Sequence, residues 1–327
     1  MSINDVESLI KQLKDLQTAF YDTFAVTDII TNSKIFEILI ADALEHTLIP
    51  GHSGSRDAKD KEGKEIEYKH FKELSSNHSW TFNDFSDTTI QKLANIKSVI
   101  FAHINDEKEG NLPEFDWYYE VPGKVVSDYL KESTLKIQNH RKMINVSPKQ
   151  IEERMGFTKI YNKNHCEGVY STWIKKIVEI TDNIEKAVNT KGILTSNKFW
   201  EVLVALKLNH QVQSEQLKHD AVDSEGNTYE YKVSKSTTWS FQDISEDVLL
   251  KYKTNKSIIL AVVDKNDFSV KTIYEANTES IIDLLKKKLL EKQERYTSQG
   301  KTVRRIQASL SGRDMVLLKA TKVYPVV

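Results

Sequence analysis

The chain has 327 residues, which corresponds to roughly two domains of ordinary size. Apolar residues make up 39% and charged residues 28%, which argues against long disordered stretches, and a net charge of −1 excludes a uniformly basic coat. The single cysteine, Cys166, excludes an internal disulfide and a cysteine zinc cluster, and the lack of a long apolar run predicts a cytoplasmic protein without a membrane segment.

The first half of the chain alternates between helical and strand patterns. Apolar residues at helical spacing predict helices over residues 6–20 and 36–43. A hairpin pattern follows over residues 57–69, and after it a helix leads to an apolar strand over 99–104. A further strand and helix over residues 117–130 close this half.

The same order of elements recurs in the second half. Helices are predicted over residues 173–184 and 199–206, a hairpin over 220–232, a strand over 258–263, and a strand and helix over 270–290. The two hairpin segments align without gaps and share eight of 13 residues, where unrelated segments share about one. The chain is therefore a tandem duplication.

The duplication predicts the fold class. We expect an α/β protein with two tandem domains, residues 1–157 and 165–327, each built on a central mixed sheet flanked by helices. The boundary is placed at residues 155–168, where the periodicity is lost.

Each hairpin carries the same three charged residues, Asp57, Glu67 and Lys69 in the first copy and Asp220, Glu230 and Lys232 in the second. The glutamate and the lysine are two apart on a strand, so their side chains point to the same face. The aspartate joins that face if Asp57 pairs with Lys69 across the hairpin. A register shifted by one residue would place it on the opposite face.

These residue types suit hydrolysis of a phosphodiester. Two neighbouring carboxylates repel each other, and a hard cation such as Mg²⁺ relieves the repulsion, which predicts one Mg²⁺ site per repeat. A lysine beside the bound water helps to position it and stabilises the charge of the transition state. A solvated strand face with surface ion pairs is the alternative interpretation.

The pattern resembles the PD-(D/E)xK nuclease superfamily and, within it, the type II restriction endonucleases. The resemblance rests on Asp57…Glu67-Tyr68-Lys69 and Asp220…Glu230-Tyr231-Lys232. The proline that precedes the aspartate in that family is replaced by Arg56 and His219, which removes no metal ligand. The resemblance implies restriction-endonuclease-like domains, products with 5′-phosphate and 3′-hydroxyl ends, and a cognate DNA methyltransferase. It also implies that the helical Glu37 and Glu201 join the metal sites, although ordinary helix-edge roles remain open for both.

Two sites in one chain predict a monomer that acts as a pseudo-dimer and cuts both strands of DNA. The resulting hypothesis is a Mg²⁺-dependent, sequence-specific double-strand endonuclease of a restriction-modification system. Three alternatives stay open: one catalytic half with a DNA-binding or allosteric copy, a repair or junction nuclease, and a non-catalytic DNA-binding or assembly module.

Candidate DNA contacts are weaker signals. Asparagine and glutamine are common readers of adenine, and basic residues contact phosphates, although turn or surface roles are the alternative for each. The candidates are Asn83, Gln242, Lys92, Lys251, Arg141, Lys142, Arg304 and Arg305. Trp80 and Trp239 alternate with phenylalanine as strand residues do, and we expect them in the cores.

Overall fold

A computed structural model of the chain describes residues 3–30, 34–50, 56–83, 86–106, 112–137, 142–164, 167–194, 196, 198–214, 219–301 and 306–325. The chain forms two compact units. The N-terminal unit runs from Asp15 to Ile180, and the C-terminal unit combines the chain up to Lys14 with the chain from Thr181 onward. The division falls inside helices α1 (Ile3–Phe24) and α6 (Ser171–Val188), so each of these helices contributes to both units.

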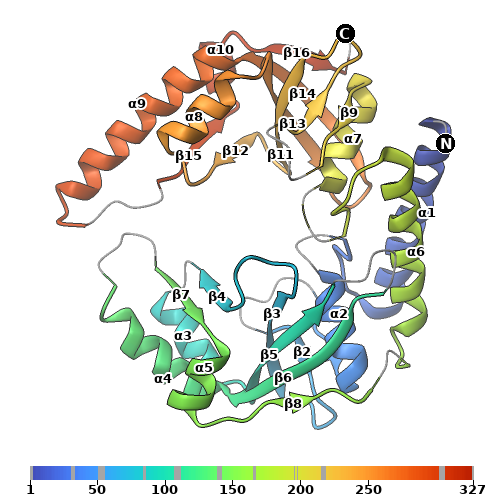
Figure 1. Ribbon diagram of the computed structural model, residues 1–327, viewed down its shortest axis with the longest axis vertical. Helices are drawn as coiled ribbons and strands as arrows, with labels where there is room; N and C mark the ends of the chain where they lie inside the picture. Colours follow the sequence, from blue (N-terminus) through green and yellow to red (C-terminus); the bar gives the residue numbers. More distant parts are fainter. Residues whose placement is uncertain are drawn as a thin grey trace. The chain divides into compact units, whose positions relative to one another are not determined.

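The N-terminal unit is built on a six-stranded mixed sheet with the order β1-β2-β3-β5-β6-β8 (Figure 1). Strands β3 and β5 are parallel, and the other neighbours in this sheet are antiparallel. Strands β4 and β7 form a separate antiparallel pair. The elements of this unit, besides its parts of α1 and α6, are α2 (Lys34–Leu44), β1 (Thr47–Leu48), β2 (Ala58–Lys59), β3 (Glu65–Lys72), β4 (Trp80–Asn83), α3 (Asp87–Ala94), β5 (Ser98–Asn105), β6 (Glu114–Pro122), α4 (Gly123–Thr134), β7 (Met143–Val146), α5 (Pro148–Gln150), the π-helix η1 (Ile151–Met155) and β8 (Ile160–Tyr161).

The C-terminal unit repeats this architecture. Its six-stranded sheet has the order β9-β10-β11-β13-β14-β16, again with one parallel pair, β11 and β13, and with β12 and β15 as a separate antiparallel pair. Its elements are α7 (Lys198–Leu208), β9 (Gln211–Val212), β10 (Ala221–Val222), β11 (Thr228–Ser234), β12 (Thr238–Phe241), α8 (Glu246–Lys253), β13 (Ser257–Asp264), β14 (Ser269–Asn277), α9 (Thr278–Thr297), β15 (Ala308–Ser311), α10 (Asp314–Leu317) and β16 (Thr321–Tyr324).

The prediction of two mixed α/β repeats with helices flanking each sheet is confirmed. Strand for strand, the two sheets have the same order and the same single parallel pair. The last strand of the first sheet, β8, lies beyond residue 157 and pairs with β6.

The hairpins that carry the charged residues are fixed by their turns. The carboxylate of Asp60 accepts hydrogen bonds from the backbone of Glu62 and Lys64, and Gly63 has a φ of +79°, which glycine adopts without steric cost. Asp223 and Gly226, with a φ of +84°, form the same turn in the second copy. Because the turn sets the register, both hairpins pair their strands in the same way.

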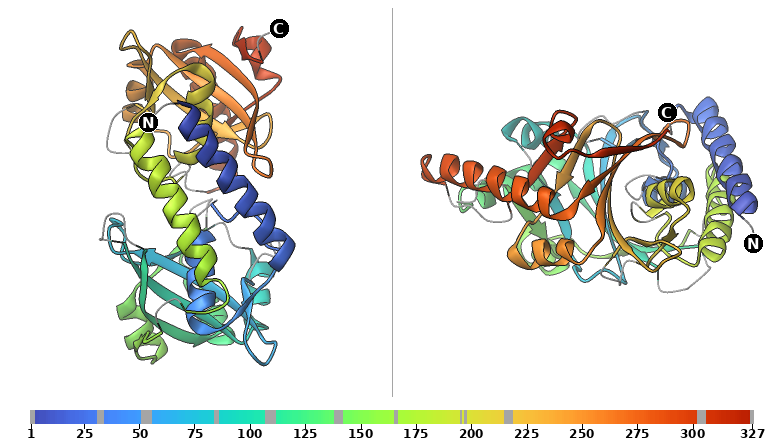
Figure 2. Two further views of the ribbon diagram at one scale, coloured as in Figure 1. Left: turned by 90° about the vertical axis from the view of Figure 1, so that its right-hand side faces the viewer. Right: turned by 90° about the horizontal axis from the view of Figure 1, so that it is seen from above.

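Each unit has its own apolar core. The indole groups of Trp80 and Trp239 are fully buried, and each donates a hydrogen bond to a backbone carbonyl oxygen of the central strand, as predicted for core residues. Helices α1 and α6 lie side by side (Figure 2). In the N-terminal unit, the last turns of α1 pack through Phe20 and Phe24 against Tyr170 and Trp173. No helix among the described residues is long and apolar enough to cross a membrane.

Candidate active site

The hairpin register brings the acidic residues together. Ala58 pairs with Ile66 in the first hairpin, and Ala221 pairs with Tyr229 in the second. One residue further along, Asp57 comes opposite Glu67, and Asp220 comes opposite Glu230. Residues directly opposite each other point to the same face, with Cβ atoms about 5 Å apart. Asp57 is therefore on the expected face, although its partner across the hairpin is Glu67 and not Lys69.

Backbone hydrogen bonds fix both aspartates. The amide of Tyr68 donates to Oδ2 of Asp57, and the amide of Tyr231 donates to Oδ2 of Asp220, each over 2.7 Å. The donor in each copy is the residue between the glutamate and the lysine. The Glu-Tyr-Lys segment thus anchors the aspartate as well as presenting its own charged side chains.

The lysines pair with the glutamates on the same strand. Nζ of Lys69 bonds to Oε1 of Glu67, and Nζ of Lys232 lies 2.6 Å from Oε1 of Glu230. Both glutamates are buried, with 8% and 4% of their surface exposed. Each lysine also lies over a core phenylalanine ring, Phe82 or Phe241. The spacing of two residues on a strand has placed the two charges together, as predicted.

In each unit, the helical glutamate forms an ion pair with a second lysine. Lys34 pairs with Glu37 on α2, and Lys198 pairs with Glu201 on α7. Both lysines are buried, which is rare for this residue type and requires the pairing. Neither lysine was predicted as a site residue. The signal was present, because both copies carry the lysine at the same position of an otherwise apolar helix.

The carboxyl groups of each unit affect one another's ionisation. Burial raises the pKa of Glu37, and the charge of Asp57 raises it further. In the other unit, burial and the charge of Asp220 raise the pKa of Glu201 to about 7. The pKa of Glu67 is raised to about 7 by burial and by Asp57, against the opposing effect of Lys69, and the pKa of Glu230 is raised in the same way. Burial lowers the pKa of Lys69 and that of Lys232, but the combined attraction of the paired glutamate and the other nearby acidic groups overcomes this effect and raises both values. Each unit therefore holds a half-buried cluster of three carboxyl groups that favours a positive charge.

These shifts predict how stability depends on pH. The folded state holds protons on Glu67 and Glu201 up to about pH 7, whereas the unfolded chain releases them near the ordinary value of 4.5. The free energy of unfolding of the metal-free protein should therefore fall as the pH rises from about 4.5 to 7, by up to about 1.4 kcal/mol per pH unit for each group. Urea unfolding in the presence of EDTA measures it. The double variant Glu67→Gln, Glu201→Gln should show a flatter profile; an unchanged slope would contradict the assignment.

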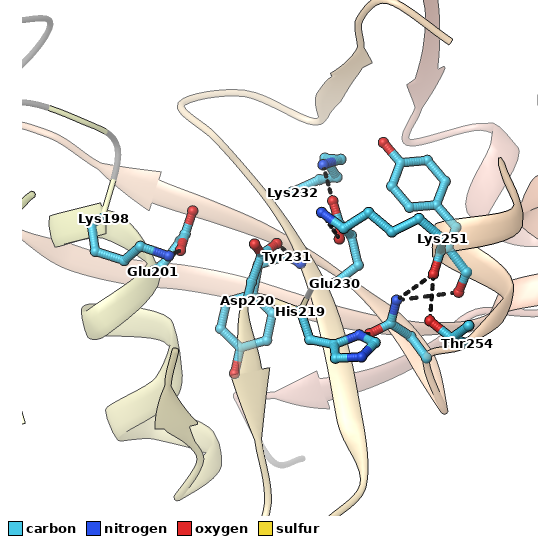
Figure 3. Close-up of polar contacts among 11 residues, drawn as sticks. Lys198, Glu201, His219, Asp220, Glu230, Tyr231, Lys232, Lys251 and Thr254 are labelled. Carbon is cyan, nitrogen blue, oxygen red and sulfur yellow. Dashed lines mark hydrogen bonds and ion pairs between the residues drawn. The ribbon is translucent and has the colours of Figure 1, made fainter. Parts of the chain in front are cut away.

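The donor set fits a hard divalent cation. Oε2 of Glu230 is buried and has no hydrogen-bond partner among the described residues, and it belongs to the carboxylate opposite Asp220 (Figure 3). Within the described parts of the chain, no three acidic, histidine or cysteine side chains form a complete ligand group. Mg²⁺ does not need one, since it is usually held by one or two carboxylates together with waters and substrate phosphates. Asp57 with Glu67, and Asp220 with Glu230, would supply such a pair in each unit.

The candidate DNA contacts lie in different environments. Asn83 at the end of β4 and Gln242 after β12 are exposed, as is Lys92 on α3. Lys142 lies 3.8 Å from Asp87, and Lys251 on α8 lies 3.8 Å from the buried oxygen of Glu230. The structure therefore brings Lys251 to the carboxylate cluster. The other three predicted contacts, Arg141, Arg304 and Arg305, lie outside the described residues.

A hydrogen bond between a tyrosine and a histidine also recurs in both units. The hydroxyl of Tyr68 shares a hydrogen bond with Nδ1 of His46, and that of Tyr231 shares one with Nδ1 of His210, each over 2.8 Å. These bonds satisfy the buried hydroxyl groups between the glutamate and the lysine. These bonds were not predicted, although the two histidines occupy matching positions of the duplication.

No protein-family model and no curated protein matches the chain. Its function is therefore inferred from the geometry of the site.

Proposed function

We propose that the chain is a Mg²⁺-dependent, sequence-specific DNA endonuclease of the type II restriction class, with one hydrolytic site in each unit. The observation that supports this proposal best is the construction of the same aspartate–glutamate–lysine cluster twice. Both units share the hairpin register, the amide hydrogen bond that anchors the aspartate, the lysine–glutamate pair on the strand and the lysine–glutamate pair on the helix. Surface ion pairs on a solvated strand would not require buried carboxylates in both copies.

The carboxylates and the lysine of each unit have separate roles in the proposed reaction. Asp57 and Glu67, or Asp220 and Glu230, would hold a divalent cation, which neutralises the phosphodiester and acidifies a bound water. Lys69 or Lys232, placed beside the glutamate, would position the attacking water and stabilise the negative charge on the phosphoryl oxygens in the transition state. Because each unit carries a complete set, one chain supplies a site for each DNA strand and acts as a monomeric pseudo-dimer.

Digestion of a long DNA of known sequence tests this proposal. With Mg²⁺ we expect discrete fragments whose ends all fall at one short sequence, with 5′-phosphates that a ligase rejoins. EDTA should stop cleavage, and added Mg²⁺ in excess should restore it. Intact DNA after incubation of folded protein with either Mg²⁺ or Mn²⁺ would overturn the proposal. A continuous smear would keep the hydrolysis and remove the sequence specificity.

A further inference from the structure

The two candidate sites differ by one lysine. In the C-terminal unit, Nζ of Lys251 lies 3.8 Å from Oε2 of Glu230, the buried oxygen that has no hydrogen-bond partner (Figure 3). Lys92 occupies the matching position on α3 of the N-terminal unit, where it is exposed and forms no ion pair with Glu67. Glu230 therefore faces two ammonium groups, whereas Glu67 faces one.

A local network holds the end of α8 that carries Lys251. The side-chain amide of the buried Asn255 donates to the carbonyl oxygens of Lys251 and Tyr252, and its own oxygen contacts Nδ1 of His219. Since His219 precedes Asp220, this network ties the helix end to the site (Figure 3).

The N-terminal unit lacks this network. Its residue at the position of Asn255 is the buried, apolar Ile96, and the residue before Asp57 is Arg56, which pairs with Glu65. Ile96 has no side-chain hydrogen-bonding group with which to hold the end of α3. The two copies therefore differ in structure at this point, because the contacts of Asn255 hold Lys251 beside the carboxylates in the C-terminal unit.

The extra lysine changes the charge of the cluster. With all groups ionised, the N-terminal cluster has three carboxylates and two lysines, namely Glu37, Asp57, Glu67, Lys34 and Lys69. The C-terminal cluster has three carboxylates and three lysines, namely Glu201, Asp220, Glu230, Lys198, Lys232 and Lys251. A cation entering the second cluster meets an ammonium group at the very oxygen that is otherwise available to it. Like charge at this range in a half-buried site weakens binding by about tenfold or more.

We propose that Lys251 makes the two sites unequal, so that the C-terminal unit binds its divalent cation more weakly and cuts its strand second. This inference rests on the proposed function and specifies how the two cuts are ordered. At limiting metal concentration, the N-terminal site is loaded first, and nicked DNA accumulates before linear DNA.

The test compares Lys251→Met with the matched variant Lys92→Met in the full-length chain. Binding of Mn²⁺ is followed through the EPR signal of the free ion. We expect the wild type to show two classes of site that differ about tenfold or more in affinity. Lys251→Met should bring the weaker class close to the stronger one, whereas Lys92→Met should leave both in place. Glu67→Gln and Glu230→Gln, which each remove one class, assign the classes to the units.

Cleavage provides a second measurement. At limiting Mg²⁺, Lys251→Met should accumulate less nicked plasmid than the wild type. Two equal classes in the wild type, or a gap in affinity that Lys251→Met leaves unchanged, would overturn the inference while leaving the proposed function standing. Absence of Mn²⁺ binding at both units would instead remove the proposed function and the inference together.

Discussion

Replacing Lys69 by alanine should turn the protein into an enzyme that nicks one strand of DNA, and Lys232→Ala should nick the other. Each lysine lies beside the glutamate of its own unit. In the proposed mechanism, it would position the attacking water of that site alone. Loss of such a group lowers the rate of one cut by about 10² to 10⁴-fold. On supercoiled plasmid, each single variant should stop at the open-circular form, and the double variant should leave the plasmid intact.

The first hairpin supplies a control for this experiment. Lys64→Ala removes an exposed lysine of the same turn, whose ion pair with Glu62 lies on the surface, and should cleave like the wild type. If either single variant of Lys69 or Lys232 abolishes both cuts, or if neither changes the product, the two-site scheme fails. Thermal melting of each variant establishes that it is folded.

The largest effect on stability is expected at the buried tryptophans. Trp239→Ala removes a side chain that is 1% exposed, leaves a cavity in the core of the C-terminal unit, and deprives the carbonyl oxygen of Ala261 of its indole donor. The free energy of unfolding should fall by about 3–5 kcal/mol. Trp80→Ala should cost a similar amount in the N-terminal unit, because Trp80 has the equivalent burial and bonds to Ala102.

Urea unfolding measures these losses. Trp239→Phe is the control, since it keeps most of the volume and loses only the indole bond, and should cost less than the alanine variant. A loss below about 1 kcal/mol for Trp239→Ala would be incompatible with a fully buried core residue and would favour an exposed, base-stacking role.

Local patterns predicted most of the fold and the centre of the site. The duplication was visible because the two copies still share their turn and strand residues, and the pairing of Glu67 with Lys69 follows from alternation along a single strand. The hairpin register was less certain, since several registers place Asp57 on the same face. The turn decides among them through Asp60 and Gly63.

The parts that depend on packing between distant segments were not predictable. The duplication marks Lys34 as a position shared with Lys198, but only the packing of α2 against the sheet buries its ammonium group beside Glu37. Lys251 reads as a solvated helix residue or a phosphate contact, because nothing in the local sequence shows that Asn255 and His219 hold the end of its helix beside the site. Such contacts join segments that are far apart in the chain, and hydrophobic periodicity carries no information about them.

In the proposed function, each unit holds a divalent cation between two carboxylates of its hairpin. A crystal structure of the protein soaked with Mn²⁺ and bound to a DNA duplex that it recognises tests it most directly, with anomalous scattering to locate the ions. We expect one peak shared by Asp57 and Glu67 and another shared by Asp220 and Glu230. Anomalous maps with no peak at either pair, in crystals where the DNA backbone reaches Lys69 and Lys232, would contradict it.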